Sequence, residues 1–295
     1  MSEFSFNQYV AKRDTGALGG TDEETRYAFG PDLKMLRGFK NFRPLELVVA
    51  SLVRSQKHLF QHRFIGRALK VSPRQLPKVH QIAKECAETL GITMPALYLT
   101  NNPMMNAFTF GTQEDSFIVV HSQLVDHFTD DELRFVIGHE MGHIQNKHVV
   151  YLTTMRLLSQ LPAILKPLQP LVSAALLTWS RRAEITCDRA GLLCCKHLDV
   201  AEKTFVKMAS GSTKHYGDID VEAYMDQLEE SQKGVGRFTE VFDSHPLLPK
   251  RVAALRIFAE SAYYRQAMGL GEDGLDIKTV DERTTDIVKI ARPTH

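Results

Sequence analysis

The sequence lacks any large excess of charge of one sign. Its 295 residues carry 36 Lys and Arg against 35 Asp and Glu, which gives a formal net charge of +1. A dedicated nucleic-acid-binding domain is expected to be basic, and a disordered chain is expected to combine high net charge with low hydrophobicity. The charge balance, together with 43% hydrophobic residues, argues against nucleic acid as a partner and favours a folded globular chain.

Cysteine is also scarce. The four cysteines are Cys86, Cys187, Cys194 and Cys195, and their spacing fits neither a paired Cys-x-x-Cys zinc site nor a dense disulfide framework. We expect Cys194 and Cys195 to pack as small hydrophobic side chains. The N-terminus shows no basic stretch leading into an apolar run, so no secretory signal is visible. These features together predict a cytoplasmic location.

Long apolar runs are missing as well. The most apolar region covers residues 157–179, but prolines and a lysine interrupt it, and its longest clean piece is residues 171–177. A membrane span needs about 20 predominantly apolar residues, so we predict no transmembrane span. We expect a proline-broken connection between two core helices. The alternative is a helical hairpin that rests on a membrane surface, which would give a peripheral membrane contact.

The secondary-structure patterns predict an α+β fold that is mainly helical, with a small mixed β-sheet. The predicted helices cover residues 45–69, residues 77–90 with a stop at Gly91, a segment from Thr129 to beyond His148, residues 174–198, and at least two segments within 221–268. Three short β-rich runs at residues 96–100, 107–110 and 117–120 are bounded by turn residues. Residues 1–30 read as a loop or arm, and the last 27 residues as a tail or strand.

The helix predicted to start at Thr129, with a capping box completed by Glu132, contains an H-E-x-x-H motif. His139 and His143 are four residues apart, so both imidazoles lie on one helical face and can reach the same zinc ion. Glu140 is placed to contact the zinc-bound water, whose pKa zinc lowers to about 7, and to accept its proton. The motif therefore predicts one Zn²⁺ per chain with a neighbouring general base.

Two further features bear on this motif. Gly138 and Gly142 share a helix face, and because a helical glycine costs about 1 kcal/mol relative to alanine, we expect another backbone to pack closely there. His58 and His62 are also four residues apart, but no carboxylate follows His58. We therefore expect the second pair not to bind metal.

A catalytic zinc usually has three protein ligands, so a third ligand must lie elsewhere. A histidine six residues beyond His143 would complete one known pattern, but Val149 occupies that position. Cys86 has no accompanying signature of a cysteine ligand. The remaining option is Glu184, which lies on a later predicted helix.

Glu184 and Asp188 form an acidic pair at i, i+4, and like charges at that spacing repel by a few tenths of a kcal/mol. A metal and an imidazole N–H would remove the repulsion. Glu184 would then bind zinc while Asp188 accepts the N–H of a ligating histidine. The alternative is a solvated acid pair among the neighbouring arginines, Arg181, Arg182 and Arg189.

H-E-x-x-H followed by E-x-x-x-D resembles the gluzincin metallopeptidases of the HtpX and CAAX prenyl endopeptidase type. Further motifs occur in the family's order, namely residues 71–77, 97–100, 106–111, 118–122 and 130–140, and Ser244-His245-Pro246 with Arg251. The resemblance covers about residues 70–260. It implies a zincin-like peptidase domain over residues 71–268, with an N-terminal arm and helices over 1–70 and a C-terminal tail over 269–295. Because membrane members carry transmembrane helices, the resemblance points to the soluble branch.

The resemblance also implies roles for residues outside the two motifs. Asn106, Ala107 and Phe108 are similar to the part of an edge strand on which an extended peptide substrate is laid by β-augmentation. His245 resembles the histidine that stabilises the oxyanion. Arg251 is expected to orient that region or to pair with an acid.

These observations predict a zinc-dependent metalloendopeptidase that hydrolyses polypeptides with a zinc-activated water and Glu140 as general base. One alternative is a non-catalytic or chaperone-like peptide-binding module that keeps a zinc site. A closed structural zinc site is expected to have four protein ligands, whereas the sequence offers three and a base. A second alternative is an exopeptidase, but no motif identifies a group that would hold a substrate terminus.

Overall fold

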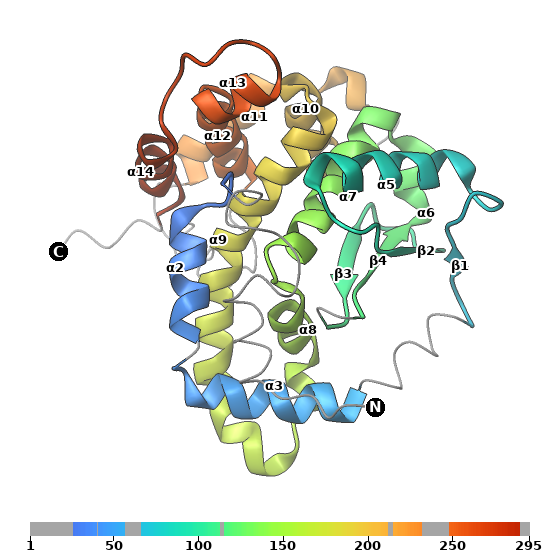
Figure 1. Ribbon diagram of the computed structural model, residues 1–295, viewed down its shortest axis with the longest axis vertical. Coiled ribbons are helices and arrows are strands. Elements are labelled where there is room, and N and C mark those ends of the chain that lie inside the picture. The colour runs from blue at the N-terminus through green and yellow to red at the C-terminus, as the bar shows by residue number, and fades with distance from the viewer. Residues whose placement is uncertain are drawn as a thin grey trace.

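The computed structural model describes residues 26–39, 41–56, 66–112, 115–211, 215–231 and 248–289. This part of the chain is mainly helical and contains one small mixed sheet on one side of the helices (Figure 1). The prediction of a mainly helical α+β fold is confirmed.

The first group of elements runs up to the H-E-x-x-H helix. It comprises α2 (Gly30–Phe39), α3 (Arg43–Gln56), β1 (Leu69–Lys70), α5 (Pro77–Leu90), β2 (Ala96–Thr100), β3 (Ala107–Phe110), β4 (Phe117–His121), α6 (Ser122–His127) and α7 (Asp130–Gln145). The second group comprises α8 (Val149–Leu157), η1 (Leu158–Gln160), η2 (Ala163–Leu168), α9 (Gln169–Cys195), α10 (Leu198–Ser210), η3 (Tyr216–Asp218), α11 (Val221–Ser231), α12 (Leu248–Ala259), α13 (Ala262–Ala267) and α14 (Ile277–Val288).

The sheet has the strand order β1-β2-β4-β3. β2 and β4 are parallel, whereas β1 pairs antiparallel with β2 and β3 pairs antiparallel with β4. All three predicted strands are present. The predicted helix over 45–69 is wrong at its end, because Leu69 belongs to β1. A two-residue strand carries no readable periodicity, and its position is set by pairing with β2, which lies far along the chain.

The H-E-x-x-H helix begins as predicted and ends earlier. Thr129 and Glu132 form the capping box at the start of α7. The helix stops at Gln145, where Lys147 has a left-handed φ of 63° and the His148 N–H donates to the carbonyl of His143. The prediction of one helix running past His148 is therefore wrong. The break turns His148 back toward α7.

α9 forms the long axis of the molecule (Figure 1). It begins at Gln169, earlier than the predicted start near residue 174. Pro170 is tolerated in its first turn, because the N–H groups there have no hydrogen-bond partner within the helix. Every residue from Ala183 to Cys195 is buried. Cys86, Cys187, Cys194 and Cys195 are all free and buried, as expected for small hydrophobic side chains.

The C-terminal segment is helical rather than a tail or strand. Asp276 caps α14 by accepting the N–H groups of Lys278 and Thr279. Asp281 of α14 lies 2.8 Å from the Arg189 guanidinium, and Val280 is fully buried. Because the burial of Val280 depends on α12, which is distant in sequence, the local pattern alone did not identify the packed helix.

α7 and α9 pack side by side with unusually close backbones (Figure 1). A Cβ added to Gly138 would lie 2.7 Å from the Cys194 Cβ, and one added to Gly142 would lie 2.8 Å from the Ala190 Cβ. Gly191 of α9 faces the carbonyl of Phe135 in the same way, at 2.7 Å. The predicted close approach of another backbone is confirmed.

None of the described helices is, taken alone, long and apolar enough to cross a membrane. The segments Val149–Gln160 and Ala163–Cys195 meet the length and composition criteria only as a pair, bent by 119° at their break.

The close approach predicts that Gly142→Ala lowers the free energy of unfolding. The new methyl group would meet the Ala190 Cβ at 2.8 Å and the Cys187 Cα at 3.1 Å, neither of which can swing away. Overpacking of this kind costs about 1–3 kcal/mol, which exceeds the gain in helix propensity. Urea unfolding followed by circular dichroism measures the effect.

Gly38→Ala is the matched control. Gly38 is also helical, and no atom lies within 4 Å of the position of its added Cβ. The control is expected to gain up to about 1 kcal/mol. Equal behaviour of the two variants would contradict the close-packing explanation.

Candidate metal centre

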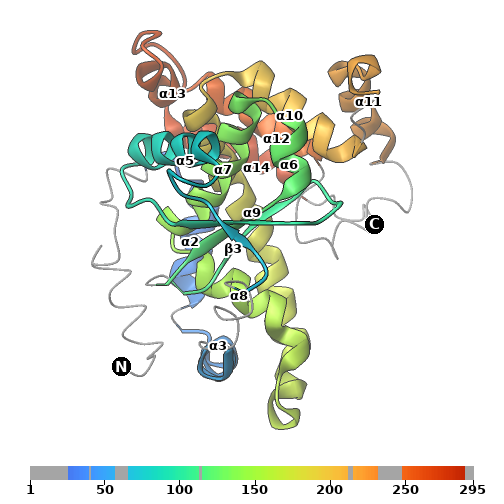
Figure 2. The ribbon, with the colours of Figure 1, turned by 90° about the vertical axis from the view of Figure 1, so that its right-hand side faces the viewer.

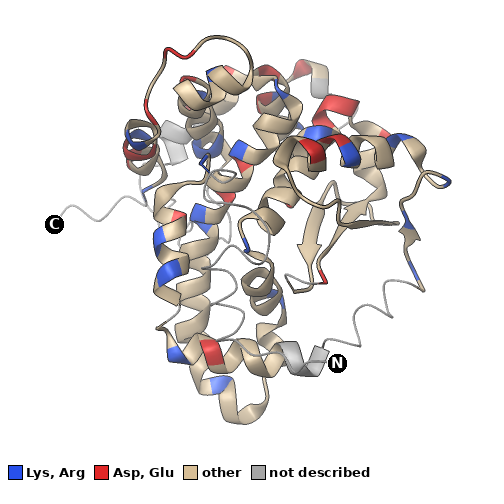
Figure 3. Ribbon diagram, viewed as in Figure 1, with Lys and Arg blue, Asp and Glu red and all other residues tan. Residues whose placement is uncertain are grey.

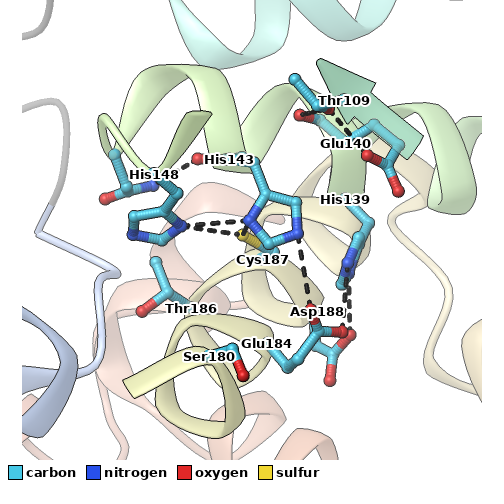
Figure 4. A network of polar contacts seen from close by, with 12 residues as sticks. Thr109, His139, Glu140, His143, His148, Ser180, Glu184, Thr186, Cys187 and Asp188 are labelled. Atoms are coloured by element: carbon cyan, nitrogen blue, oxygen red, sulfur yellow. Dashed lines mark hydrogen bonds and ion pairs between the residues drawn. The ribbon is translucent and has the colours of Figure 1, made fainter. Parts of the chain in front are cut away.

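Three buried side chains meet where α7 crosses α9 (Figure 4). The Nε2 atoms of His139 and His143 each lie 3.5 Å from a carboxylate oxygen of Glu184, and the two imidazole centroids are 5.0 Å apart. One ligand atom from each of the three residues lies within 4.8 Å of the others. Two imidazoles and a carboxylate form a donor set that suits zinc. The structure therefore brings together the three ligands predicted from the sequence.

The outer nitrogen of His139 contacts Asp188. Nδ1 lies 2.9 Å from Asp188 Oδ1. Burial alone lowers the pKa of His139, but the carboxylates of Glu184 and Asp188 raise it above its ordinary value. With the Nδ1 proton donated to Asp188, the Nε2 lone pair faces Glu184 and is available to a metal.

Arg251 holds Asp188 from the opposite side. Its Nε donates to Asp188 Oδ2 at 2.8 Å, and one of its terminal nitrogens lies 3.1 Å from Glu184. Burial alone would raise the pKa of Asp188, but Arg251 and His139 lower it below its ordinary value. The expectation that Arg251 pairs with an acid is confirmed. The two acids on α9 are therefore buried and paired with His139 of α7 and Arg251 of α12, rather than solvated.

Glu140 lies beside this cluster, on the side that faces the sheet (Figure 4). The hydroxyl of Thr109 on β3 donates to Glu140 Oε2 at 2.7 Å. Both residues are buried. The edge strand therefore fixes the orientation of the carboxylate beside the histidines, a contact that the sequence did not indicate.

β3 is the last strand of the sheet next to this site. The carbonyl of Asn106 accepts the N–H of His121, so the backbone groups of Ala107 and Thr109 face the open side of β3. Arg156 donates to the Thr109 carbonyl at 2.9 Å, and its guanidinium lies 5.1 Å from the centre of the Phe108 ring. Among the described residues, Arg156 thus occupies the open side of the strand at Thr109, and Ala107 faces the same side.

A second buried cluster surrounds the other side of His143. Its Nδ1 lies 3.1 Å from the Nδ1 of His148 and 3.1 Å from the Sγ of Cys187. These three residues could also hold a metal ion by their spacing. His148 Nε2 in turn lies 3.0 Å from the fully buried Asp32 of α2, at ion-pair distance but outside hydrogen-bond geometry.

The chemistry of these groups favours a hydrogen-bonded support for His143 over a second metal site. Burial and the surrounding carboxylates raise the pKa of Cys187 well above its ordinary value, which disfavours the thiolate that a metal would need there. Asp32 also accepts from Trp179 Nε1 and the Thr186 hydroxyl, at 2.8 and 2.7 Å. A proton on His148 Nε2 beside this carboxylate leaves His148 Nδ1 free to accept the proton of His143 Nδ1.

One weak signal for this second cluster is present in the sequence. His148 directly precedes Val149, the position at which a third histidine ligand would complete the known pattern. In the predicted helix running past His148, however, the His148 side chain would not lie beside His143. Asp32 lies in a separate helix of the chain and carried no motif. His245, His58 and His62 lie outside the described residues, so the expectations for them stay predictions.

The buried pair between Arg251 and Asp188 predicts that Arg251→Met destabilises the protein strongly. Removing one partner leaves a buried carboxylate without its cation, which costs about 3–5 kcal/mol. Arg256→Met is the matched control on the same helix. Arg256 pairs with Glu202 in a more exposed place, so its loss is expected to cost about 1 kcal/mol or less. Denaturant unfolding of both variants tests this difference, and equal losses would contradict it.

Comparisons with known proteins agree with this geometry. Residues 73–259 match the family described as Peptidase family M48. The plastoglobule-localized metallopeptidase 48, chloroplastic, of Arabidopsis thaliana is 35% identical over 174 residues, which are 57% of this chain and 51% of the relative. A protein named Protease HtpX homolog from Moorella thermoacetica is 29% identical over 111 residues, which are 36% of this chain and 37% of that relative.

A second Protease HtpX homolog, from Halobacterium salinarum, is 32% identical over 88 residues, which are 30% of each chain. No solved structure matches this chain. The chain spans about half the length of the plastoglobule relative and less of the two HtpX homologs. The predicted resemblance to HtpX-type metallopeptidases is confirmed, and because the family match covers more than half of its residues, the chain belongs to peptidase family M48.

Proposed function

We propose that this chain is a zinc-dependent metalloendopeptidase whose single zinc ion is held by His139, His143 and Glu184. The observation that carries the proposal is the arrangement of the two imidazoles. Both Nε2 atoms face the Glu184 carboxylate at 3.5 Å, while each Nδ1 atom is engaged by another buried group. Membership of family M48 implies a metal cofactor, and the printed names of the relatives describe them as a metallopeptidase and proteases.

When bound, zinc supplies Lewis-acid chemistry that makes a water more acidic and polarises a carbonyl. Glu140 accepts the proton of the attacking water and then delivers it to the leaving amine. The Thr109 hydroxyl holds the Glu140 carboxylate in place from β3 at 2.7 Å. His245 is proposed, from the family resemblance, to donate a hydrogen bond to the developing oxyanion.

The proposed substrate is an extended polypeptide that pairs with the open side of β3. The backbone of Ala107 faces that side, while Arg156 occupies the carbonyl of Thr109. Pairing would therefore use the backbone of Ala107 and stop at Thr109, which also holds the general base, because the Asn106 carbonyl is already engaged by His121. This arrangement would place an internal stretch of the peptide beside Glu140, as expected of an endopeptidase.

The cytoplasmic location stays a prediction. The name of the Arabidopsis relative places that protein in plastoglobules of the chloroplast. A non-catalytic peptide-binding module would have the same ligands and the same strand edge, so cleavage itself is the property that distinguishes the two functions.

Glu140→Gln is expected to keep its zinc and to lose peptide cleavage. Glutamine preserves the size and the contact with Thr109 but cannot accept a proton, and loss of a general base costs about 10²- to 10⁴-fold in rate. Zinc content and digestion of an unfolded protein are measured together, with cleavage sites mapped by mass spectrometry.

Glu88→Gln provides the control for Glu140→Gln, because Glu88 is exposed on α5 and its ion-pair partner is Lys84 of the same helix rather than a residue of the site. It is expected to cleave at the wild-type rate. Wild-type cleavage by Glu140→Gln would disprove the assigned base. Absence of cleavage in the zinc-loaded wild type would instead favour the peptide-binding module.

Glu184→Ala and Cys187→Ala distinguish the two buried clusters. Both residues lie on α9 within one turn, but we assign the metal to the cluster that contains Glu184. Glu184→Ala is expected to lose most of its zinc after gel filtration, whereas Cys187→Ala is expected to retain about one zinc per chain. Full zinc in Glu184→Ala, or loss of zinc in Cys187→Ala, would place the metal in the other cluster.

A further inference from the structure

The connection between α8 and α9 projects from one end of the molecule in both ribbon views (Figures 1 and 2). We call residues 161–171 the hairpin tip. It contains η2 and the start of α9, and no residue of η2 is buried. Ile164 is 86% exposed and Leu171 is 53% exposed. Two large apolar side chains therefore face solvent on the most protruding part of the fold.

The hairpin tip is built to present these side chains. Leu161, Leu165 and Leu168 turn inward and pack in the core cluster formed with α3 and α8. Three prolines within the tip, Pro162, Pro167 and Pro170, restrict its backbone conformation. Because the inward leucines anchor the tip, Ile164 and Leu171 are not needed for the core. The prolines lower the entropy that the tip would lose on docking.

Basic residues predominate in the part of the chain that forms the hairpin tip and its flanks. The chain carries 35 acidic residues, yet residues 141–183 contain none, while they contain five basic residues. Lys166 is exposed on the tip itself, and Lys34 and Arg37 are exposed on α2, which packs on α9. Figure 3 shows the contrast, with most acidic positions gathered at the opposite end of the molecule.

Among the described residues, the neighbouring helix α3 brings an acidic residue close to the tip. Glu46 of α3 forms an ion pair with Arg43 at 2.7 Å, so the pair adds no net charge. Leu47 on the same helix is 41% exposed and extends the apolar surface. The end of the molecule thus combines exposed aliphatic side chains with basic residues.

We propose that the hairpin tip docks onto an anionic lipid surface. Ile164 and Leu171 would enter the boundary between headgroups and acyl chains, where burial of apolar area provides affinity. Lys166 would lay its aliphatic stem along that boundary and place its ammonium among the lipid phosphates. The lack of acidic residues over this stretch removes the repulsion that an anionic surface would otherwise exert.

Docking at the tip fixes the distance between the surface and the metal centre. Leu171 and Glu184 lie on the same helix, and at 1.5 Å per residue they are about 20 Å apart along its axis. The tip and the site are therefore separate, so docking does not rest on the proposed catalytic function. It would hold the site near segments that emerge from the lipid surface.

Flotation of the purified full chain with lipid vesicles tests the proposal. The wild type is expected to float with vesicles of phosphatidylcholine and phosphatidylglycerol, to bind vesicles of phosphatidylcholine alone much more weakly, and to lose binding as NaCl is raised. No flotation with the anionic vesicles would overturn the proposal, as would equal binding to both vesicle types.

The variant Ile164→Ser with Leu171→Ser is expected to weaken binding to anionic vesicles by at least about tenfold, and Lys166→Glu by a similar factor. Leu270→Ser and Lys278→Glu are the matched controls. Leu270 is 59% exposed and Lys278 is exposed, but both lie near α13 and α14, away from the tip. They are expected to bind like the wild type, and equal losses in the controls would overturn the assignment of the tip.

Sedimentation of the same variants without lipid separates a protein interface from a lipid contact. A concentration-dependent dimer that disappears in Ile164→Ser with Leu171→Ser would show that a second copy covers this surface, which would overturn the proposal. A monomer in both cases supports the lipid contact. All substituted side chains are exposed, so thermal unfolding is expected to be unchanged and loss of binding would not reflect misfolding.

Discussion

The close approach of the α7 and α9 backbones is the constraint on which the site depends. Both helices carry their polar groups four residues apart, His139 and His143 on one, Glu184 and Asp188 on the other. These two pairs of polar residues face each other in antiparallel order. His139 contacts Asp188, and both histidines contact Glu184. Side chains this short reach one another only because glycines let the helices approach. The packing of small residues therefore sets the geometry of the proposed zinc site.

The two histidines of the site are supported on their Nδ1 sides by different buried residues. Asp188 and Arg251 fix the Nδ1 side of His139, whereas His148 and Cys187 contact the Nδ1 side of His143. Supports on Nδ1 leave Nε2 of both rings in place to be the proposed metal-binding nitrogen. Asp32, which backs His148, lies outside residues 73–259 that match the family. The N-terminal helix α2 is thus tied to the centre of the matched domain.

Local patterns predicted the parts of the site that are local. The spacing within α7, its capping box and the acidic pair on α9 each lie within one or two helical turns, so a 3.6-residue period is enough to identify them. The break after Gln145, the two-residue strand β1 and the helix α14 depend on partners far along the chain. His148 and Asp32 were missed for the same reason, because their meeting requires both the break after α7 and the docking of α2.

The same separation between local and global properties applies to charge. A net charge of +1 argued against nucleic acid but concealed the distribution, because residues 141–183 contain no acid while the rest of the chain carries all 35. This stretch is flanked by Glu140 and Glu184, so the acidic residues at both of its ends belong to the buried site. α9 shows this division along its length, since most residues of its first turns are exposed or half-buried and every residue from Ala183 onward is buried. One rigid helix therefore serves a solvent-facing tip at one end and the proposed metal site at the other.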